Sequence, residues 1–147
     1  MKISIIIPVY NEESTIENVV LSNDILATIN CLETLGKDIT IKGDNVKTLI
    51  VKNKENYNIN DQEELIFNCL ESGSTLRFFI PIALLYNKKS VFKGTEKLIS
   101  RGISIYEEIC EKQGIKIIKT NNTLTFIGKL QADNFEIKGN ISSQFIS

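Results

Sequence analysis

The stretch Glu71-Ser72-Gly73-Ser74-Thr75-Leu76-Arg77 lies between a short apolar run at residues 65–67 and a longer one at residues 78–86. This order predicts a strand, a tight turn and a helix, with Ser72 as the residue that caps the helix N-terminus. Gly73 has no side chain, so a ligand could approach its backbone closely, and the first N–H groups of the helix point outward at the positive end of its dipole. The stretch is therefore either an ordinary capped helix or an anion-binding site.

The composition predicts one globular domain with a hydrophobic core. The chain has 147 residues, of which 42% are hydrophobic and 24% are charged. Its 17 basic and 18 acidic residues give a net charge of −1, without the basic surplus typical of proteins that bind nucleic acid or anionic membranes. A bound anion would therefore have to be held locally. The apolar run at residues 3–7 is too short for a membrane span or a secretory signal, so we expect a cytoplasmic protein.

The chemistry open to the chain is limited by its cysteines and by the absence of histidine. Cys31, Cys69 and Cys110 are odd in number, widely spaced and surrounded by apolar residues, which predicts buried free thiols rather than disulfides or a zinc site. Histidine is the commonest general base and metal ligand, and the chain has none. We therefore expect no bound metal, and chemistry based on Arg, Lys, carboxylates and backbone amides.

The elements before residue 71 begin with a buried strand at residues 2–7 and a turn at residues 8–13 that leads into a helix. Ser22 or Asn23 can cap the next helix, and Gly36 can end it. The apolar positions expected on one face of this helix are Ile25, Leu26, Ile29, Leu32 and Leu35. Strands at residues 39–42 and 46–52 form a hairpin, and residues 53–64 form a surface loop.

The elements expected after residue 71 continue to alternate between helices and strands. A largely buried helix with Pro81 inside it covers residues 74–86, and a strand follows at residues 90–92. A helical stretch at residues 95–111 is interrupted near Arg101-Gly102, and residues 115–119 and 123–127 form a hairpin. A strand at residues 134–138 and the start of a helix complete the chain. The order βαβαββ predicts an α/β repeat rather than a doubly wound sheet.

The first residues resemble a different class of protein from the rest. Ile7-Pro8-Val9-Tyr10-Asn11-Glu12-Glu13 is similar to the opening of nucleotide-sugar glycosyltransferases, in which this strand and turn begin the donor site. The later Asp-x-Asp metal motif of that family does not follow.

From about residue 14 to residue 147 the chain resembles the enolpyruvyl transferases, and among them the EPSP synthase family. The landmarks are Leu21-Ser22-Asn23-Asp24-Ile25 with Ala27-Thr28-Ile29, the stretch from Glu71 to Phe78, Leu98-Ile99-Ser100-Arg101-Gly102-Ile103, and Gly139-Asn140-Ile141-Ser142-Ser143-Gln144-Phe145. They follow the order and the spacing of the family.

The resemblance implies two similar domains built of βαβαββ units, with parallel helices inside, sheets outside and the substrates in the cleft between the domains. The family transfers the enolpyruvyl group of phosphoenolpyruvate to shikimate 3-phosphate and needs no metal or organic cofactor. By this resemblance, the chain would be an incomplete N-terminal domain, with the acid/base residues in a second domain that the chain lacks. Residues 21–147 would belong to that domain, and residues 1–20 would be an atypical segment in place of the family's Pro-Ser-Lys-Ser stretch.

The resemblance also assigns the binding residues. Gly73, Arg101 and Gln144 would contact phosphoenolpyruvate, while Ser142, Ser143 and Gln144 would contact shikimate 3-phosphate. The Ser-Ser-Gln run argues against the related transferase that acts on a UDP-sugar. Arg77 also keeps the family pattern, and we interpret it as structural.

Two alternatives remain open at the level of sequence. The first is a non-catalytic phosphate-binding module. The second is the remnant of a nucleotide-sugar glycosyltransferase. In the enzyme interpretation, the chain alone is expected to be inactive.

Overall fold

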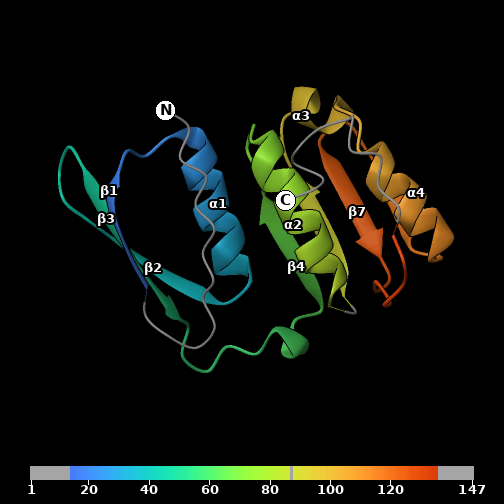
Figure 1. The fold of residues 1–147 in the computed structure, drawn as a ribbon, viewed down its shortest axis with the longest axis horizontal. Helices are drawn as coiled ribbons and strands as arrows, with labels where there is room; N and C mark the ends of the chain where they lie inside the picture. The colour runs from blue at the N-terminus through green and yellow to red at the C-terminus, as the bar shows by residue number, and fades with distance from the viewer. Residues whose placement is uncertain (1–13, 87, 136–147) are drawn as a thin grey trace.

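The fold consists of two sheets with helices packed beside them (Figure 1). The structure is a computed structural model and describes residues 14–86 and 88–135. Helix α1 (Asn23–Thr34) contacts strand β2 (Lys37–Lys42), which belongs to the first sheet. It also contacts strand β4 (Glu64–Asn68) and helix α2 (Gly73–Leu84), which belong to the second unit, namely the second sheet with the helices that connect its strands. It therefore joins the two units. None of the helices in the described ranges is long and apolar enough to cross a membrane.

The first sheet contains three antiparallel strands, β1 (Ser14–Val19), β2 and β3 (Lys47–Asn53), in the order β1-β3-β2. The predicted hairpin is confirmed as β2 and β3 (Lys47–Asn53), which are joined through a turn at Gly43. The prediction of a helix after the turn at residues 8–13 is wrong, because Ser14–Val19 forms strand β1, which pairs with β3. Ser14 and Ile16 are less exposed than Thr15 and Glu17, and this period of two belongs to a strand with one covered face.

Helix α1 begins and ends where the sequence predicts. The Ser22 hydroxyl oxygen accepts a hydrogen bond from the Ile25 N–H at 3.3 Å, and Gly36 adopts a φ of +82° just beyond the helix. The predicted apolar face is only partly confirmed, since Leu26 is 38% exposed. The buried side chains of α1 point to two cores: Ile29 packs with the first sheet, and Cys31 packs with the second unit.

The second unit has the predicted order βαβαββ. Its elements are β4, α2, β5 (Lys89–Lys93), α3 (Glu96–Ser100) with α4 (Ser104–Lys112), β6 (Lys116–Lys119) and β7 (Thr123–Ile127). The strands lie in the order β4-β5-β7-β6, with β4 and β5 parallel and the other pairs antiparallel. The α/β class, the break between α3 and α4 and the second hairpin are confirmed. One short 3-10 helix, η1 (Ile59–Asp61), lies in the predicted loop before β4.

Some expectations fall wholly or partly outside the described residues. These are the strand at residues 2–7, the turn at residues 8–13, most of the strand at residues 134–138 and the final helix start. Asn134 and Phe135, the described part of the predicted strand, are not in a strand.

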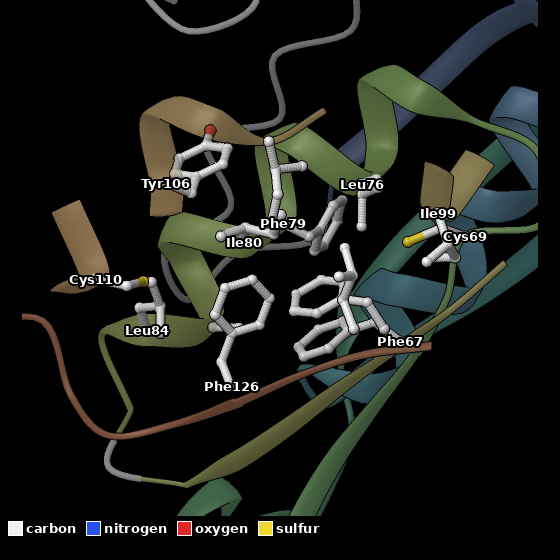
Figure 2. Close-up of a cluster of buried hydrophobic side chains, with 14 of the residues drawn as sticks. Phe67, Cys69, Leu76, Phe79, Ile80, Leu84, Ile99, Tyr106, Cys110 and Phe126 are labelled. Carbon is white, nitrogen blue, oxygen red and sulfur yellow. The ribbon is translucent and has the colours of Figure 1, made fainter. Parts of the chain in front are cut away.

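The main core lies between the four-stranded sheet and helices α2 and α4 (Figure 2). The rings of Phe67 and Phe92 stack with their centroids 4.7 Å apart, and Phe126 meets Phe92 edge-on at 5.7 Å. From α2, Phe79 and Ile80 pack into this cluster. The three cysteines are buried free thiols, as predicted.

Pro81 leaves a gap in the hydrogen bonding of α2 that α4 fills. Proline has no N–H, so the carbonyl oxygen of Arg77, four residues earlier, lacks its usual helical donor. The Tyr106 hydroxyl of α4 donates to this oxygen at 2.7 Å. A polar group left without a partner by Pro81 is therefore satisfied across the interface between two helices.

We expect Tyr106→Phe to lower the free energy of unfolding by about 1–3 kcal/mol, because it leaves a partly buried carbonyl oxygen without a donor. In a Pro81→Ala background the backbone gains an N–H that can bond to the same oxygen, so the cost of Tyr106→Phe should be clearly smaller. Urea unfolding of the four proteins of this double-mutant cycle measures the difference. Equal costs in the two backgrounds would contradict this account.

Candidate functional site

The first turn of α2 is a capped helix N-terminus with a partly exposed glycine at its start. Ser72 is 1% exposed, and its hydroxyl oxygen accepts a hydrogen bond from the Thr75 N–H at 3.2 Å, so the predicted cap is confirmed. Gly73 is the first helical residue. The N–H groups of such a turn have no partners within the helix and lie at the positive end of its dipole.

Hydroxyl groups connect this turn to the first turn of α1. Thr75 Oγ1 lies 2.8 Å from Ser72 Oγ and 3.0 Å from Thr28 Oγ1. The Thr28 hydroxyl in turn donates to the Asp24 carbonyl oxygen at 2.9 Å. The N-terminal turns of the two helices are therefore held side by side, and their positive ends lie on the same side of the molecule.

The loop before α2 is linked to the loop before α3. Leu70 has a φ of 51°, which is unusual for a residue with a side chain, and its N–H donates to the Asn68 side-chain oxygen at 3.3 Å. The Leu70 carbonyl oxygen accepts a hydrogen bond from Thr95 N–H at 3.0 Å, and Thr95 then caps α3. The position of α3, and of the residue that follows it, is thus set relative to the start of α2.

Two arginine side chains meet beside Gly73. A β carbon placed on Gly73 would lie 3.2 Å from Nη1 of Arg101 and 3.2 Å from Nη1 of Arg77. The two Nη1 atoms are therefore no farther apart than twice that distance. Arg101 is the C-cap residue of α3, and Arg77 lies in the second turn of α2.

Gly73 and Arg101, which the family resemblance assigned to phosphoenolpyruvate, lie close together in the structure. The guanidinium group of Arg77, a residue that we interpreted as structural, lies at the same point, and the role of this residue stays a prediction. The sequence did contain a signal for it, because residues four apart on a helix share a face and Arg77 lies four residues after Gly73. Ser142, Ser143 and Gln144 lie outside the described residues.

Three side chains of the core, Cys31, Cys110 and Tyr106, have raised pKa values and remain neutral at physiological pH. A hydrogen bond to Cys69 and burial raise the pKa of the Cys31 thiol far above its usual value, and burial raises the pKa of Cys110 to about 11. Burial also raises the pKa of Tyr106 to about 12, although the positive charge of Arg77 acts in the opposite direction. These thiols are therefore poor nucleophiles.

The described part of the chain contains no group of three or more His, Cys, Asp or Glu side chains that could hold a metal ion. The arrangement at Gly73 instead combines backbone amides, hydroxyl groups and guanidinium groups. Such a set can bind and orient a phosphate or carboxylate group, since guanidinium N–H groups match the oxygens of both anions.

Comparison with known proteins gives one consistent family. Residues 6–147 match the family model described as EPSP synthase (3-phosphoshikimate 1-carboxyvinyltransferase). The chain is 46% identical over 142 residues to a 3-phosphoshikimate 1-carboxyvinyltransferase of Clostridium novyi, covering 91% of this chain and 32% of the relative. It is 41% identical to the protein of the same name from Clostridioides difficile, with coverages of 93% and 33%. The chain thus spans about a third of the length of the curated relatives it matches.

Solved structures show the same likeness in three dimensions. An EPSP synthase from Acinetobacter baumannii aligns with a TM-score of 0.63 at 16% identity, covering 91% of this chain and 31% of that one. A second structure of EPSP synthase from this organism, at 2.37 Å, gives a TM-score of 0.59. At this identity the likeness concerns the fold alone, and the predicted fold class is confirmed.

We expect Gly73→Ala to fold normally but to bind inorganic phosphate more weakly. Alanine suits a helix start with ordinary backbone angles, so the free energy of unfolding should stay the same or rise by up to about 1 kcal/mol. The new methyl group would crowd both guanidinium groups and displace them. Phosphate affinity should fall roughly fivefold to tenfold, about 1–1.4 kcal/mol, in an NMR titration.

Gly102→Ala is the matched control. It makes the same change beside Arg101, but its β carbon meets no atom within 4 Å. Equal phosphate affinities of the two variants would show that the space at Gly73 is not part of an anion site.

Proposed function

The chain belongs to the EPSP synthase family, and on that premise we propose that it supplies part of the site that transfers the enolpyruvyl group from phosphoenolpyruvate to shikimate 3-phosphate. The observation that carries the proposal is the meeting of two guanidinium groups beside the partly exposed start of α2. Phosphoenolpyruvate has a phosphate and a carboxylate group, and forked guanidinium donors and helix N-terminal amides suit both.

The proposed roles follow the family motifs residue by residue. Gly73 offers a backbone amide to phosphoenolpyruvate, and Arg101 pairs with one of its anionic groups. Ser142 and Ser143 hydrogen-bond the phosphate of shikimate 3-phosphate, and Gln144 contacts both substrates. With this Ser-Ser-Gln run, the preferred acceptor is shikimate 3-phosphate rather than a UDP-sugar.

In this mechanism the chain binds and orients the substrates. The hydroxyl of shikimate 3-phosphate loses its proton and adds to the carbon of phosphoenolpyruvate that carries the phosphate, while the neighbouring methylene carbon takes up a proton and becomes a methyl group. Elimination then removes one proton from this methyl group and expels phosphate, which restores the carbon–carbon double bond. Fixed amides and cations hold the anionic groups so that the two reacting atoms approach in a water-poor site. The acid/base carboxylates are expected in a second domain that closes over the substrates.

The domain assignment remains part of the proposal. Residues 21–147 would form part of an N-terminal domain, and residues 1–20 would form a segment atypical of the family. Strand β1 pairs residues 14–19 with β3, and the family match begins at residue 6, so any atypical part would best be sought before β1. A cytoplasmic location is proposed because buried free thiols in odd number suit a reducing compartment.

We expect the 147-residue chain to bind substrates weakly and not to turn them over. With part of the site present, affinity for shikimate 3-phosphate should be in the millimolar range, about −4 kcal/mol, and should weaken as salt rises. Chemical-shift mapping should show that shikimate 3-phosphate perturbs Ser142, Ser143 and Gln144, and that phosphoenolpyruvate perturbs Gly73. No phosphate should be released from the two substrates together.

Three results would contradict this proposal. Measurable phosphate release would show that the chain holds a complete catalytic site. A stronger perturbation of residues 142–144 by UDP-N-acetylglucosamine would contradict the substrate assignment. Anion binding that is equally strong for phosphoenolpyruvate, shikimate 3-phosphate and inorganic sulfate would favour a non-catalytic phosphate-binding module.

A further inference from the structure

We propose that Cys31 and Cys69 form an oxidative modification site, at which a low-molecular-weight disulfide such as oxidised glutathione converts the two thiols into one disulfide bond. The bond joins helix α1 to the loop that leads into α2, and thus links the two units covalently. The inference is independent of the proposed function. It starts from the distance between the two Sγ atoms, which is 3.9 Å.

The two thiols face each other inside the core. Cys31 lies in the third turn of α1, Cys69 directly follows β4, and both are 0% exposed. A disulfide bond needs about 2 Å between its sulfur atoms, so the two sulfurs must approach each other by roughly half of their present distance. Rotation about the Cα–Cβ bonds displaces a sulfur atom by that much. The product carries no charge, so the apolar surroundings do not oppose its formation.

The loop that begins at Cys69 gives this thiol a route to the solvent. Leu70 has a φ of 51°, a left-handed conformation that costs free energy in a residue with a β carbon. A surface hollow of about 400 Å³ is lined by Asn68 and Leu70, the two neighbours of Cys69, so the outer side of this short segment is in contact with water. A strained segment of this kind opens locally more readily than the strand or helix beside it. Cys69 is therefore the thiol that an oxidant reaches first.

Two thiol–disulfide exchanges form the bond. The Cys69 thiolate attacks one sulfur of the oxidant, and the first small thiolate leaves and takes up the proton that Cys69 has lost. The Cys31 thiolate then attacks the Cys69 sulfur of this mixed disulfide and expels the second small thiolate, which takes up the proton of Cys31. Two electrons and two protons thus pass from the chain to the oxidant. Cys31 is a poor nucleophile in the closed core, so the pair reacts only as the loop opens.

The bond restrains the start of α2. Its two cysteines are 38 positions apart, so a cross-link removes much of the freedom of the unfolded chain and stabilises the fold. The carbonyl oxygen of Cys69 accepts a hydrogen bond from the Ser72 N–H at 2.8 Å, and Ser72 caps α2. The oxidised chain therefore holds α1, the loop and the first turn of α2 as one connected piece.

The test equilibrates the whole 147-residue chain with reduced and oxidised glutathione, once in native buffer and once in concentrated urea. Acid stops the exchange, and alkylation followed by mass spectrometry counts the free thiols. The native chain should fall from three free thiols to one, and digestion should give one linked pair of peptides that contain Cys31 and Cys69. The bond should form at least about tenfold more favourably in the native chain than in urea, because the fold holds the two sulfurs together.

Cys110→Ala is the matched control, because it removes a thiol of the same core that forms no hydrogen bond with another thiol in the described part of the chain. This variant should form the bond as readily as the unaltered chain, within about twofold. Cys31→Ala and Cys69→Ala should each leave no intramolecular bond. The urea midpoint of the oxidised unaltered chain should lie above that of the reduced chain, and the oxidant should not raise the midpoint of Cys69→Ala.

The unaltered chain decides the question even if a variant fails to fold, because its peptide map needs no substitution. A native chain that keeps three free thiols under conditions that oxidise it in urea would overturn the inference. A bond that includes Cys110, or a bond that forms no more readily in native buffer than in urea, would overturn it as well. Each of these results would leave the proposed function untouched.

Discussion

The hydrogen bond from the Tyr106 hydroxyl to the Arg77 carbonyl oxygen connects the two helical segments that form the candidate site. It exists because Pro81 cannot supply the helical N–H that this oxygen would otherwise accept. Helix α2 carries Gly73 and Arg77, and the α3–α4 segment carries Arg101 and Tyr106. The Arg77 carbonyl oxygen, which lacks a helical donor because of Pro81, thus holds the α3–α4 segment, which carries Arg101, against helix α2. The surrounding core is apolar, so this polar contact also fixes how the helices are aligned.

The chemistry of the site is that of fixed dipoles and permanent cations. The capped turns of α1 and α2 are joined by hydroxyl groups. A hydrogen bond to Cys69 and burial raise the pKa of Cys31, and burial raises the pKa of Cys110, so these two thiols stay protonated. Groups of this kind can hold an anion and favour negative charge that develops during a reaction. In the proposed function these groups bind and orient the substrates, and the chain spans about a third of the length of the curated relatives that it matches.

Local signals in the sequence predicted most of the fold. Ser22, Ser72 and Gly36 act within one helical turn, and the hairpin at Gly43 depends on a few neighbouring residues, so each could be identified without knowledge of the rest. Strand β1 was missed because its conformation depends on pairing with β3, which lies far along the chain. The position of the Arg77 side chain could not be predicted for a related reason: the sequence gives its helical face, but only the packed structure places its guanidinium group relative to that of Arg101. The contacts assigned to residues 142–144 remain predictions.

The most direct measurement follows the binding groups themselves. In a chain labelled with ¹⁵N-arginine and ¹⁵N-glycine, the Nη signals of Arg101 and the amide signal of Gly73 can be observed while phosphoenolpyruvate is added, and no residue has to be changed. An anion held by the two groups must shift both signals with the same concentration dependence, and added salt must weaken both responses together. A shift of the Arg101 signals alone, or two different midpoints, would contradict a shared anion site at the start of α2.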